Sequence, residues 1–221
     1  MEHNSGFFIT FEGIEGCGKT TQISQLATAL RQQQLDVIVT REPGGCQISD
    51  KIRSILLDPG NKAIAPETEL LLYAAARAQH IAQVIRPALQ LGKIVLCDRF
   101  CDATLAYQGY GRKLEISVIE QLNNYACQGI EPALTLLLDF PVEIGLDRAR
   151  SRNAQNHCQN EDRFEQESLA FHQRIRDAYL RLSNDQPQRI KVIDANGDYD
   201  TVFKRIIDTT IPLLKQRFGN E

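Results

Sequence analysis

The chain has 221 residues, 43% hydrophobic and 24% charged, which is typical of a soluble globular protein long enough to bury a substantial core. Its formal net charge of -3 disfavours duplex nucleic acid as a partner, because such partners select a basic excess. The start MEHNSGFFIT does not resemble a signal peptide, no apolar run is long enough to span a membrane, and the six cysteines show no zinc-binding spacing. We therefore expect a cytoplasmic protein with reduced thiols.

Short apolar runs alternate with longer segments of helical periodicity along the chain. The runs, interpreted as strands, cover residues 7–11, 36–40, 93–97, 134–139 and 190–194. They are almost continuously apolar, as in strands buried on both faces of a parallel sheet. The segments interpreted as helices cover residues 19–33, 47–57, 66–90, 115–127, 143–152, 161–183 and 200–218. This alternation predicts a single α/β domain over residues 1–221, with a parallel sheet and right-handed crossovers.

A glycine-rich loop joins the first predicted strand to the first predicted helix. Gly13, Gly18, Lys19 and Thr20 fit the pattern G-x-x-x-x-G-K-[ST] in the strand–loop–helix context that this pattern requires. The glycines let successive N–H groups point into one concavity, and the following helix adds its positive dipole end. The loop thus predicts a site for nucleoside triphosphate phosphates, formed by Gly13, Ile14, Glu15, Gly16, Cys17, Gly18, Lys19, Thr20 and Thr21.

This loop alone leaves open which kind of nucleotide-binding protein the chain is. A GTPase switch would need a guanine-reading N-K-x-D motif, which the 221 residues lack. We favour a phosphoryl-transfer enzyme with a small acceptor. The alternatives are a kinase for another nucleotide acceptor and a non-catalytic ATP-binding module.

Charged side chains follow the predicted strands at the edge where open α/β sheets bind ligands. Arg41 follows residues 36–40, and Asp98 and Arg99 follow residues 93–97. Because guanidinium groups match phosphate oxygens bidentately, two arginines at strand ends of one sheet favour a phosphorylated acceptor, and the alternative for each is an ordinary surface arginine. Thr20 and Asp98 are the expected Mg²⁺ ligands, with Asp139, after the fourth predicted strand, as the rival of Asp98.

Two further segments carry candidate residues. Tyr73 and Arg77 share one face of a predicted helix, but from spacing alone we expect Tyr73 in the core and Arg77 as a solvated charge. Residues 148–167 are almost all polar, which predicts a mobile segment. Its arginines could close over a triphosphate as a lid or belong to a solvated loop, and the phosphate site favours the lid; they are Arg148, Arg150, Arg152 and Arg163.

The stretches FEGIEGCGKTTQ, TREPGG, YAAARAQH and DRFCDATLAYQGYGR, followed by the arginine-bearing segment, together resemble the bacterial thymidylate kinase family. The resemblance covers essentially the whole chain. It implies a five-stranded parallel sheet flanked by helices, of the P-loop NTP hydrolase type, in a single domain with a mobile lid at about residues 148–164. It also implies a homodimer that phosphorylates dTMP to dTDP with ATP and Mg²⁺, a step of dTTP biosynthesis. The implied partners are these small molecules, with no nucleic-acid polymer and no membrane.

The resemblance assigns an acceptor site. Arg99 would hold the phosphate of dTMP, helped by Arg53 and Arg41. Tyr73 would stack on thymine and Arg77 would bond to its O4, which reverses the interpretation from spacing alone. The other implied dTMP-binding residues are Glu42 and Pro43 of the REPGG motif, Thr104 and Gln108 at the thymine N3 edge, and Tyr107 against the sugar 2′ position.

The resemblance also assigns roles near the transferred phosphoryl group. Glu15 would face the 3′-hydroxyl of the acceptor sugar, and the catalytic arginine would come from the lid, as Arg150 or Arg152, because the loop itself has none. Asn196, after the last strand, is the expected adenine contact. The stretch NAQNHCQN makes the lid longer than the family pattern, and its His157 and Cys158 are too few to predict a metal site.

Overall fold

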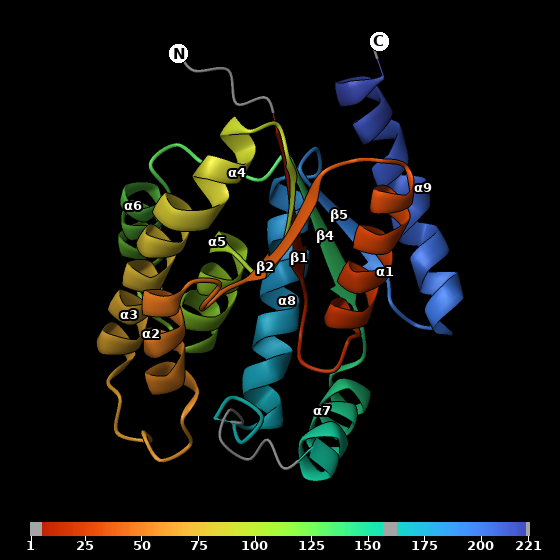
Figure 1. The fold of residues 1–221 in the computed structure, drawn as a ribbon. Coiled ribbons are helices and arrows are strands. Elements are labelled where there is room, and N and C mark those ends of the chain that lie inside the picture. The colour runs from red at the N-terminus through yellow and green to blue at the C-terminus, as the bar shows by residue number, and fades with distance from the viewer. Residues whose placement is uncertain (1–5, 157–162, 220–221) are drawn as a thin grey trace.

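The computed structural model describes residues 6–156 and 163–219 of the chain. In that part, five strands form one parallel sheet in the order β2-β3-β1-β4-β5 (Figure 1). They are β1 (Phe7–Glu12), β2 (Val37–Arg41), β3 (Ile94–Asp98), β4 (Leu134–Asp139) and β5 (Ile190–Asp194). The prediction of a five-stranded parallel sheet is confirmed. Two strands begin and end one residue later than predicted, so Arg41 and Asp98 are the last residues of β2 and β3.

Helices cover both faces of the sheet. They are α1 (Lys19–Gln32), α2 (Gln47–Leu57), α3 (Pro66–His80), α4 (Arg86–Gln90), α5 (Cys101–Thr104), α6 (Ile116–Cys127), α7 (Val142–Asn156), α8 (Leu169–Asp185) and α9 (Tyr199–Phe218), with π-helical stretches η1 (Ile81–Ile85) and η2 (Leu105–Gly111). Figure 1 shows α1 and α9 together on one side and α2, α3, α4 and α6 grouped on the other. None of the helices in the described ranges is both long and apolar enough to cross a membrane.

Strand side chains alternate between the two faces and so divide the core. Ile9 and Leu96 belong to the larger cluster, which includes Leu26 of α1 and Ile206 of α9. Their neighbours Phe8 and Val95 point the other way, into a second cluster with residues of η1, α4 and α6. By the same alternation, Glu12 at the end of β1 lies on the face of Phe8. The Glu12 carboxylate therefore lies in the buried layer on that face of the sheet.

Three stretches differ from their predicted secondary structure, apart from the polar segment 148–167. The predicted helix 66–90 is interrupted by η1, which precedes Pro87 and changes the hydrogen-bond register before a residue that cannot donate. Residues 101–111, which we did not assign as helical, form α5 and η2. The helix predicted over 161–183 begins at Leu169, where the Ser168 hydroxyl accepts a hydrogen bond from the Phe171 N–H.

More of the polar segment 148–167 is helical than the sequence predicted. Helix α7 extends from Val142 to Asn156, four residues beyond the predicted end at residue 152. Polar residues can continue a helix that has already formed, because each added residue gains a hydrogen bond. His157 and Cys158, considered above as metal ligands, lie outside the described residues.

Candidate active site

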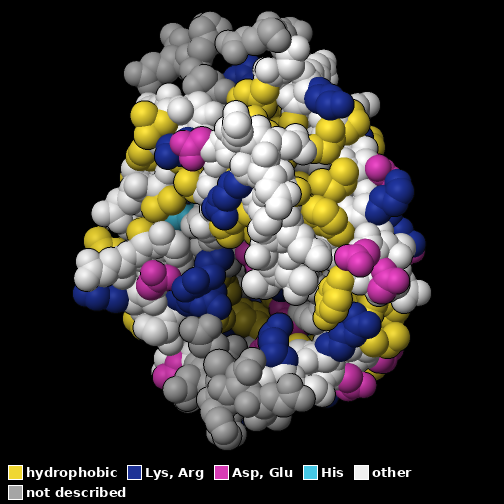
Figure 2. All heavy atoms as spheres, turned by 45° about the vertical axis from the view of Figure 1, so that its right-hand side comes forward, with side chains coloured by type: hydrophobic (Ala, Val, Ile, Leu, Met, Phe, Trp, Pro, Cys, Tyr) yellow, Lys and Arg dark blue, Asp and Glu magenta, His cyan; other side chains and the backbone are white. Residues whose placement is uncertain are grey.

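A cavity of about 1110 Å³ opens at the carboxyl ends of β1, β2 and β3. Figure 2 shows a hollow on this side of the molecule, with Lys and Arg side chains at its rim. Most of the predicted site residues line the cavity: Glu15, Gly16, Gly18, Lys19, Thr20, Thr21, Arg41, Glu42, Pro43, Arg53, Tyr73, Arg77, Asp98, Arg99, Thr104, Tyr107, Gln108 and Arg152. Five others do not belong to its described lining: Gly13, Ile14, Cys17, Arg150 and Asn196.

The glycine loop, residues 13–20, has the backbone that its sequence requires. Gly13, Gly16 and Gly18 have φ values of 136°, 69° and 94°, which L side chains rarely adopt. A Cβ atom on Gly16 would stand 1.9 Å from the carbonyl oxygen of Gly145, so the loop packs directly on the backbone of α7. Lys19 Nζ donates to the carbonyl oxygens of Gly13 at 3.0 Å and Ile14 at 2.9 Å. These carbonyls hold the ammonium group beside the first turn of α1.

Thr20 and Asp98 meet at the mouth of this loop. The Thr20 hydroxyl donates to Asp98 Oδ2 at 3.3 Å. The rival carboxylate, Asp139, instead receives two hydrogen bonds from the Arg176 guanidinium at 2.7 and 2.9 Å. No cluster of three His, Cys, Asp or Glu side chains that could hold a metal occurs in the described residues. A hydroxyl and one carboxylate beside a phosphate nest fit Mg²⁺, which keeps several waters and takes further ligands from substrate phosphates.

Arg99 and Glu15 form the centre of the cavity. Arg99 Nη2 donates to Glu15 Oε1 at 3.0 Å, and the Tyr107 hydroxyl donates to the same oxygen. The Arg99 guanidinium also lies 4.8 Å from the centroid of the Tyr107 ring. Burial disfavours the charged form of Glu15, but Arg99, together with His172 and Lys19, holds the pKa of this carboxyl well below its usual range. Glu15 is therefore an anion at neutral pH.

Burial also disfavours the charge on Arg99, but neighbouring phenol oxygens and the Glu15 carboxylate hold its pKa well above the usual range. The backbone of Arg99 is unusual as well, with φ of 70°. Left-handed backbone is uncommon for a non-glycine residue and is found preferentially at functional sites.

His172 of α8 is a further neighbour of Glu15 that the sequence analysis missed. Its side chain is fully buried, with Nδ1 3.3 Å from Glu15 Oε2 and Nε2 3.0 Å from the carbonyl oxygen of Phe164. It thus links the glycine loop to the turn that precedes α8. A histidine on the apolar face of a helix gave no sequence signal for this contact.

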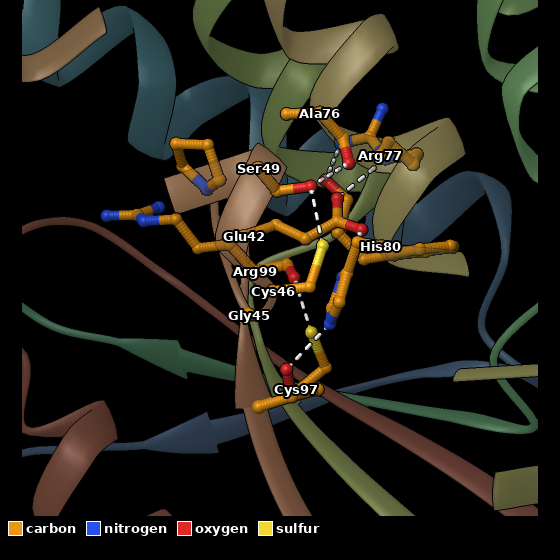
Figure 3. A network of polar contacts seen from close by, with 12 residues as sticks. Glu42, Gly45, Cys46, Ser49, Ala76, Arg77, His80, Cys97 and Arg99 are labelled. Atoms are coloured by element: carbon orange, nitrogen blue, oxygen red, sulfur yellow. Dashed lines mark hydrogen bonds and ion pairs between the residues drawn. The ribbon is translucent and has the colours of Figure 1, made fainter. Parts of the chain in front are cut away.

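Arg77 is buried, and the interpretation of this residue as a solvated charge is wrong. Only 1% of its surface is exposed, and its Nε donates to Glu42 Oε2 at 2.7 Å. Its two terminal nitrogens donate to Asn123, Phe100 and Thr104 at 2.7–3.0 Å. Figure 3 shows Glu42 reaching between Arg77 and His80. These bonds fix the guanidinium, and Arg77 belongs to the lining of the cavity.

Glu42 is held by a second contact. His80 Nδ1 lies 3.0 Å from Glu42 Oε1, and His80 Nε2 lies 2.6 Å from the Thr40 hydroxyl. Gly45 makes room for this ring, because a Cβ atom there would stand 2.4 Å from His80 Nε2. The REPGG motif therefore positions a carboxylate under Arg77 as well as turning the chain.

The remaining expected acceptor residues come from α2, α3, α5 and η2. Tyr73 lines the cavity, and burial raises the pKa of its phenol above the usual range. Thr104 accepts from Arg77, whereas Gln108 donates to the buried carboxylate of Glu69 at 2.8 Å. Arg53 donates to the carbonyl oxygen of Pro43 at 3.0 Å. The aromatic ring and the polar groups thus border one space.

The four arginines of the predicted lid have different surroundings. Arg148 stacks on Phe140 at 4.4 Å, and Arg163 is buried against Glu69 at 2.7 Å. Arg150 donates to the carbonyl oxygen of Glu165 at 3.1 Å. Arg152 lines the cavity with a side chain that is 55% exposed, 3.9 Å from the Glu165 carboxylate. Arg152 is therefore the one of these four whose guanidinium borders the cavity.

Asn196 lies after β5, where its N–H donates to Asp194 Oδ1 at 2.9 Å and its carbonyl oxygen accepts from Arg205 at 2.8 Å. The nearby carbonyl oxygen of Tyr199 accepts from Gln22 of α1. This segment thus flanks the helix that starts at the glycine loop, while Asn196 stands outside the cavity lining.

The chain is similar to known proteins over almost its full length. A family model for thymidylate kinase matches residues 11–206. A thymidylate kinase of Syntrophotalea carbinolica is 62% identical over 92% of this chain and 94% of its own length. One from Geobacter sulfurreducens is 54% identical over 96% of this chain and 100% of its own length. The crystal structure of thymidylate kinase from Ehrlichia chaffeensis superimposes with a TM-score of 0.74, at 31% identity, over 92% of this chain and 98% of that one.

Proposed function

The chain belongs to the thymidylate kinase family, and from this premise we propose that it transfers the γ-phosphoryl group of ATP to dTMP, giving ADP and dTDP. The observation that carries this proposal is that one cavity joins the glycine loop to an arginine-rich acceptor side. A phosphate acceptor oxygen is already ionised at neutral pH, so the transfer needs no general base. It needs alignment of the two nucleotides and stabilisation of charge.

On the donor side, the N–H groups of residues 13–18 and the start of α1 bind the triphosphate. Lys19, held by two loop carbonyls, reaches the β- and γ-phosphates. Arg152 stabilises the equatorial oxygens of the transferring group, because it is the lid arginine that borders the cavity. Arg150 acts indirectly: it donates to the backbone of Glu165, the residue whose carboxylate lies near Arg152. Asn196 contacts adenine from the edge of the donor site.

On the acceptor side, Arg99 holds the phosphate of dTMP with help from Arg53 and Arg41. Tyr73 stacks on thymine, and Arg77 bonds to its O4. Glu15 orients the 3′-hydroxyl of the sugar. The other contacts come from Glu42 and Pro43 below the phosphate, Thr104 and Gln108 at the base, and Tyr107 at the sugar 2′ position.

Thr20 and Asp98 would hold Mg²⁺ beside the β- and γ-phosphates. The ion supplies positive charge that offsets the charge of the transferring group. The contact between the two ligand side chains supports this pairing, and the engagement of Asp139 with Arg176 supports Asp98 over its rival.

The test is ADP release, measured with ATP and Mg²⁺ across dTMP, dUMP, dCMP, dGMP, AMP and thymidine. Turnover with dTMP alone, or with dUMP trailing, is the expected result, and Lys19→Met is the inactive control. Turnover with a different acceptor would keep the donor chemistry and discard the base-site assignments. ATP binding without turnover on any acceptor would favour a binding module.

We also propose a cytoplasmic homodimer that binds ATP and dTMP and has no nucleic-acid polymer or membrane as a partner. Helices α2, α3 and α6 pack side by side (Figure 1) and expose large apolar side chains, namely Ile48, Ile55, Leu71, Val118 and Tyr125. Sedimentation at micromolar concentration is expected to give a dimer, and Leu71→Glu is expected to give a monomer. A monomeric wild-type chain would refute this part.

A further inference from the structure

We propose that Glu12 and Tyr179, buried behind the cavity wall, are positioning residues that hold Arg99 in place for the phosphate of the acceptor. Their side chains are 0% and 2% exposed, so they do not reach the substrates themselves. The inference rests on the phosphate-binding role proposed for Arg99. It adds two residues, one from the end of β1 and one from α8, that nothing in the glycine-loop pattern includes.

The first arm of this arrangement fixes the backbone of Arg99. Glu12 Oε1 accepts a hydrogen bond from the Phe100 N–H at 2.7 Å. The Arg99 N–H donates to the carbonyl oxygen of Phe11 at 2.9 Å. Arg99 lies between these two bonds with φ of 70°, a conformation that persists in a non-glycine residue only where its surroundings enforce it. The carboxylate therefore fixes the turn from which the Arg99 side chain starts.

The second arm fixes the guanidinium. The Tyr179 hydroxyl donates to Glu12 Oε2 at 2.7 Å and accepts from Arg99 Nη1 at 3.1 Å. A phenol has one donor and can also accept, so one hydroxyl serves both bonds. Each oxygen of a single carboxylate thus supports Arg99, one through the backbone and one through the side chain.

The two terminal nitrogens of the Arg99 guanidinium have different partners, which suits a ligand that enters from the cavity. Nη1 is anchored behind the wall by Tyr179, whereas Nη2 bonds to Glu15 on the wall. A phosphate can therefore take bonds from the Nη2 side while the Nη1 anchor stays in place. Preorganisation of this kind lowers the entropy that binding would otherwise cost.

The surroundings of Glu12 also indicate that its role is to position Arg99 rather than to stabilise the fold. Its carboxylate is fully buried, and both of its oxygens accept from neutral donors. Burial raises the pKa of Glu12 to about 7, the Asp102 carboxylate on α5 adds to this, and Arg99 opposes it. A buried carboxylate of this kind destabilises the fold on its own account, which requires a compensating reason for its presence.

The experiment compares binding of dTMP with binding of thymidine, which lacks the phosphate. Calorimetry gives the affinity for dTMP, and competitive inhibition gives that for thymidine. Tyr179→Phe removes the hydroxyl alone, and Glu12→Gln is the second variant. Tyr110→Phe is the matched control, because the Tyr110 ring lies under Arg181, away from this network. Both test variants are also made in an Arg99→Met background.

Tyr179→Phe and Glu12→Gln are expected to weaken dTMP binding roughly tenfold, the effect of losing one hydrogen bond to a charged group, and to leave thymidine unchanged. In the Arg99→Met background neither should weaken dTMP further. Equal losses for dTMP and thymidine, or the same loss with and without Arg99, would overturn the inference. If Arg99→Met itself leaves dTMP affinity unchanged, the proposed role of Arg99 fails instead.

Discussion

The buried ion pair between Arg77 and Glu42 allows a quantitative prediction. The two side chains are 1% and 4% exposed and meet at 2.7 Å. We consider Arg77→Met, which keeps much of the side-chain volume and removes every donor. The change leaves the Glu42 carboxylate with the His80 contact at 3.0 Å. It also leaves acceptors on Asn123 and Phe100 without their donor.

Breaking one side of a buried pair in this way costs about 3–5 kcal/mol in the free energy of unfolding, because a buried charge is left uncompensated. In a chain of 221 residues this corresponds to a fall in Tm of roughly 6–20 °C. Glu42→Gln in the same chain neutralises the remaining carboxylate. The double variant is therefore expected to recover part of the loss, with a coupling energy of about 2 kcal/mol.

Urea unfolding of the four proteins, followed by fluorescence and circular dichroism, measures this cycle. Arg41→Met is the matched control, since Arg41 and Asp50 form an arginine–carboxylate pair at 3.2 Å with side chains 55% and 45% exposed. That control is expected to change stability by less than about 1 kcal/mol. A coupling energy below about 0.5 kcal/mol between Arg77 and Glu42 would refute the reasoning.

Three further predictions concern the donor site, the lid and the buried carboxylate. Lys19→Met is expected to lower kcat at least about 100-fold in the coupled assay with little loss of stability, because it removes a charge aimed at the phosphates; a smaller fall would argue against that role. Arg152→Met is expected to lower kcat by about 10³-fold, as removal of a catalytic arginine does, whereas Arg150→Met lowers it less; equal losses would contradict the choice between them. The Glu12 carboxyl has its pKa raised from 4.5 to about 7 in the folded chain. Its protonated form is therefore compatible with folding, and the stability that this form provides is fully present below pH 4.5 and is lost as the pH rises through 7. Relative to the wild type, Glu12→Gln should therefore gain about 3 kcal/mol of unfolding free energy between pH 4 and 8, and a flat difference across that window in urea titrations would disprove the assignment.

The strands were predictable because a strand that is buried on both faces of the sheet has a nearly continuous apolar sequence. Residues 101–111 were harder, since two glycines and only short apolar spacing conceal a helix whose last part has π-helical bonding. The start of α8 was misplaced because residues 163–168, apart from Phe164, are polar and fit either a turn or a helix end. What decides this boundary is the Ser168 cap, a local bond that periodicity does not report.

The site shows a similar division. Lys19, Thr20 and Asp98 could be found from the loop pattern and the strand ends, because their chemistry depends on local backbone. Spacing alone misjudged Arg77, because its partners are far apart in the sequence: one follows β2, two lie at the two ends of α5, and one lies in α6. Glu12 and Tyr179 were passed over, although a carboxylate closing an otherwise apolar strand beside the glycine loop was a usable signal.

The central place of β1 in the sheet has a consequence for the order of events in turnover. The glycine loop leaves β1 toward α1, whereas Asp98, Arg99 and Arg41 stand at the ends of β3 and β2, to one side of it. With the proposed site assignments, donor and acceptor occupy separate stretches of one cavity and can be bound together. Such an arrangement suits a sequential mechanism with a ternary complex, in which the phosphoryl group passes directly between nucleotides and no phosphorylated enzyme accumulates.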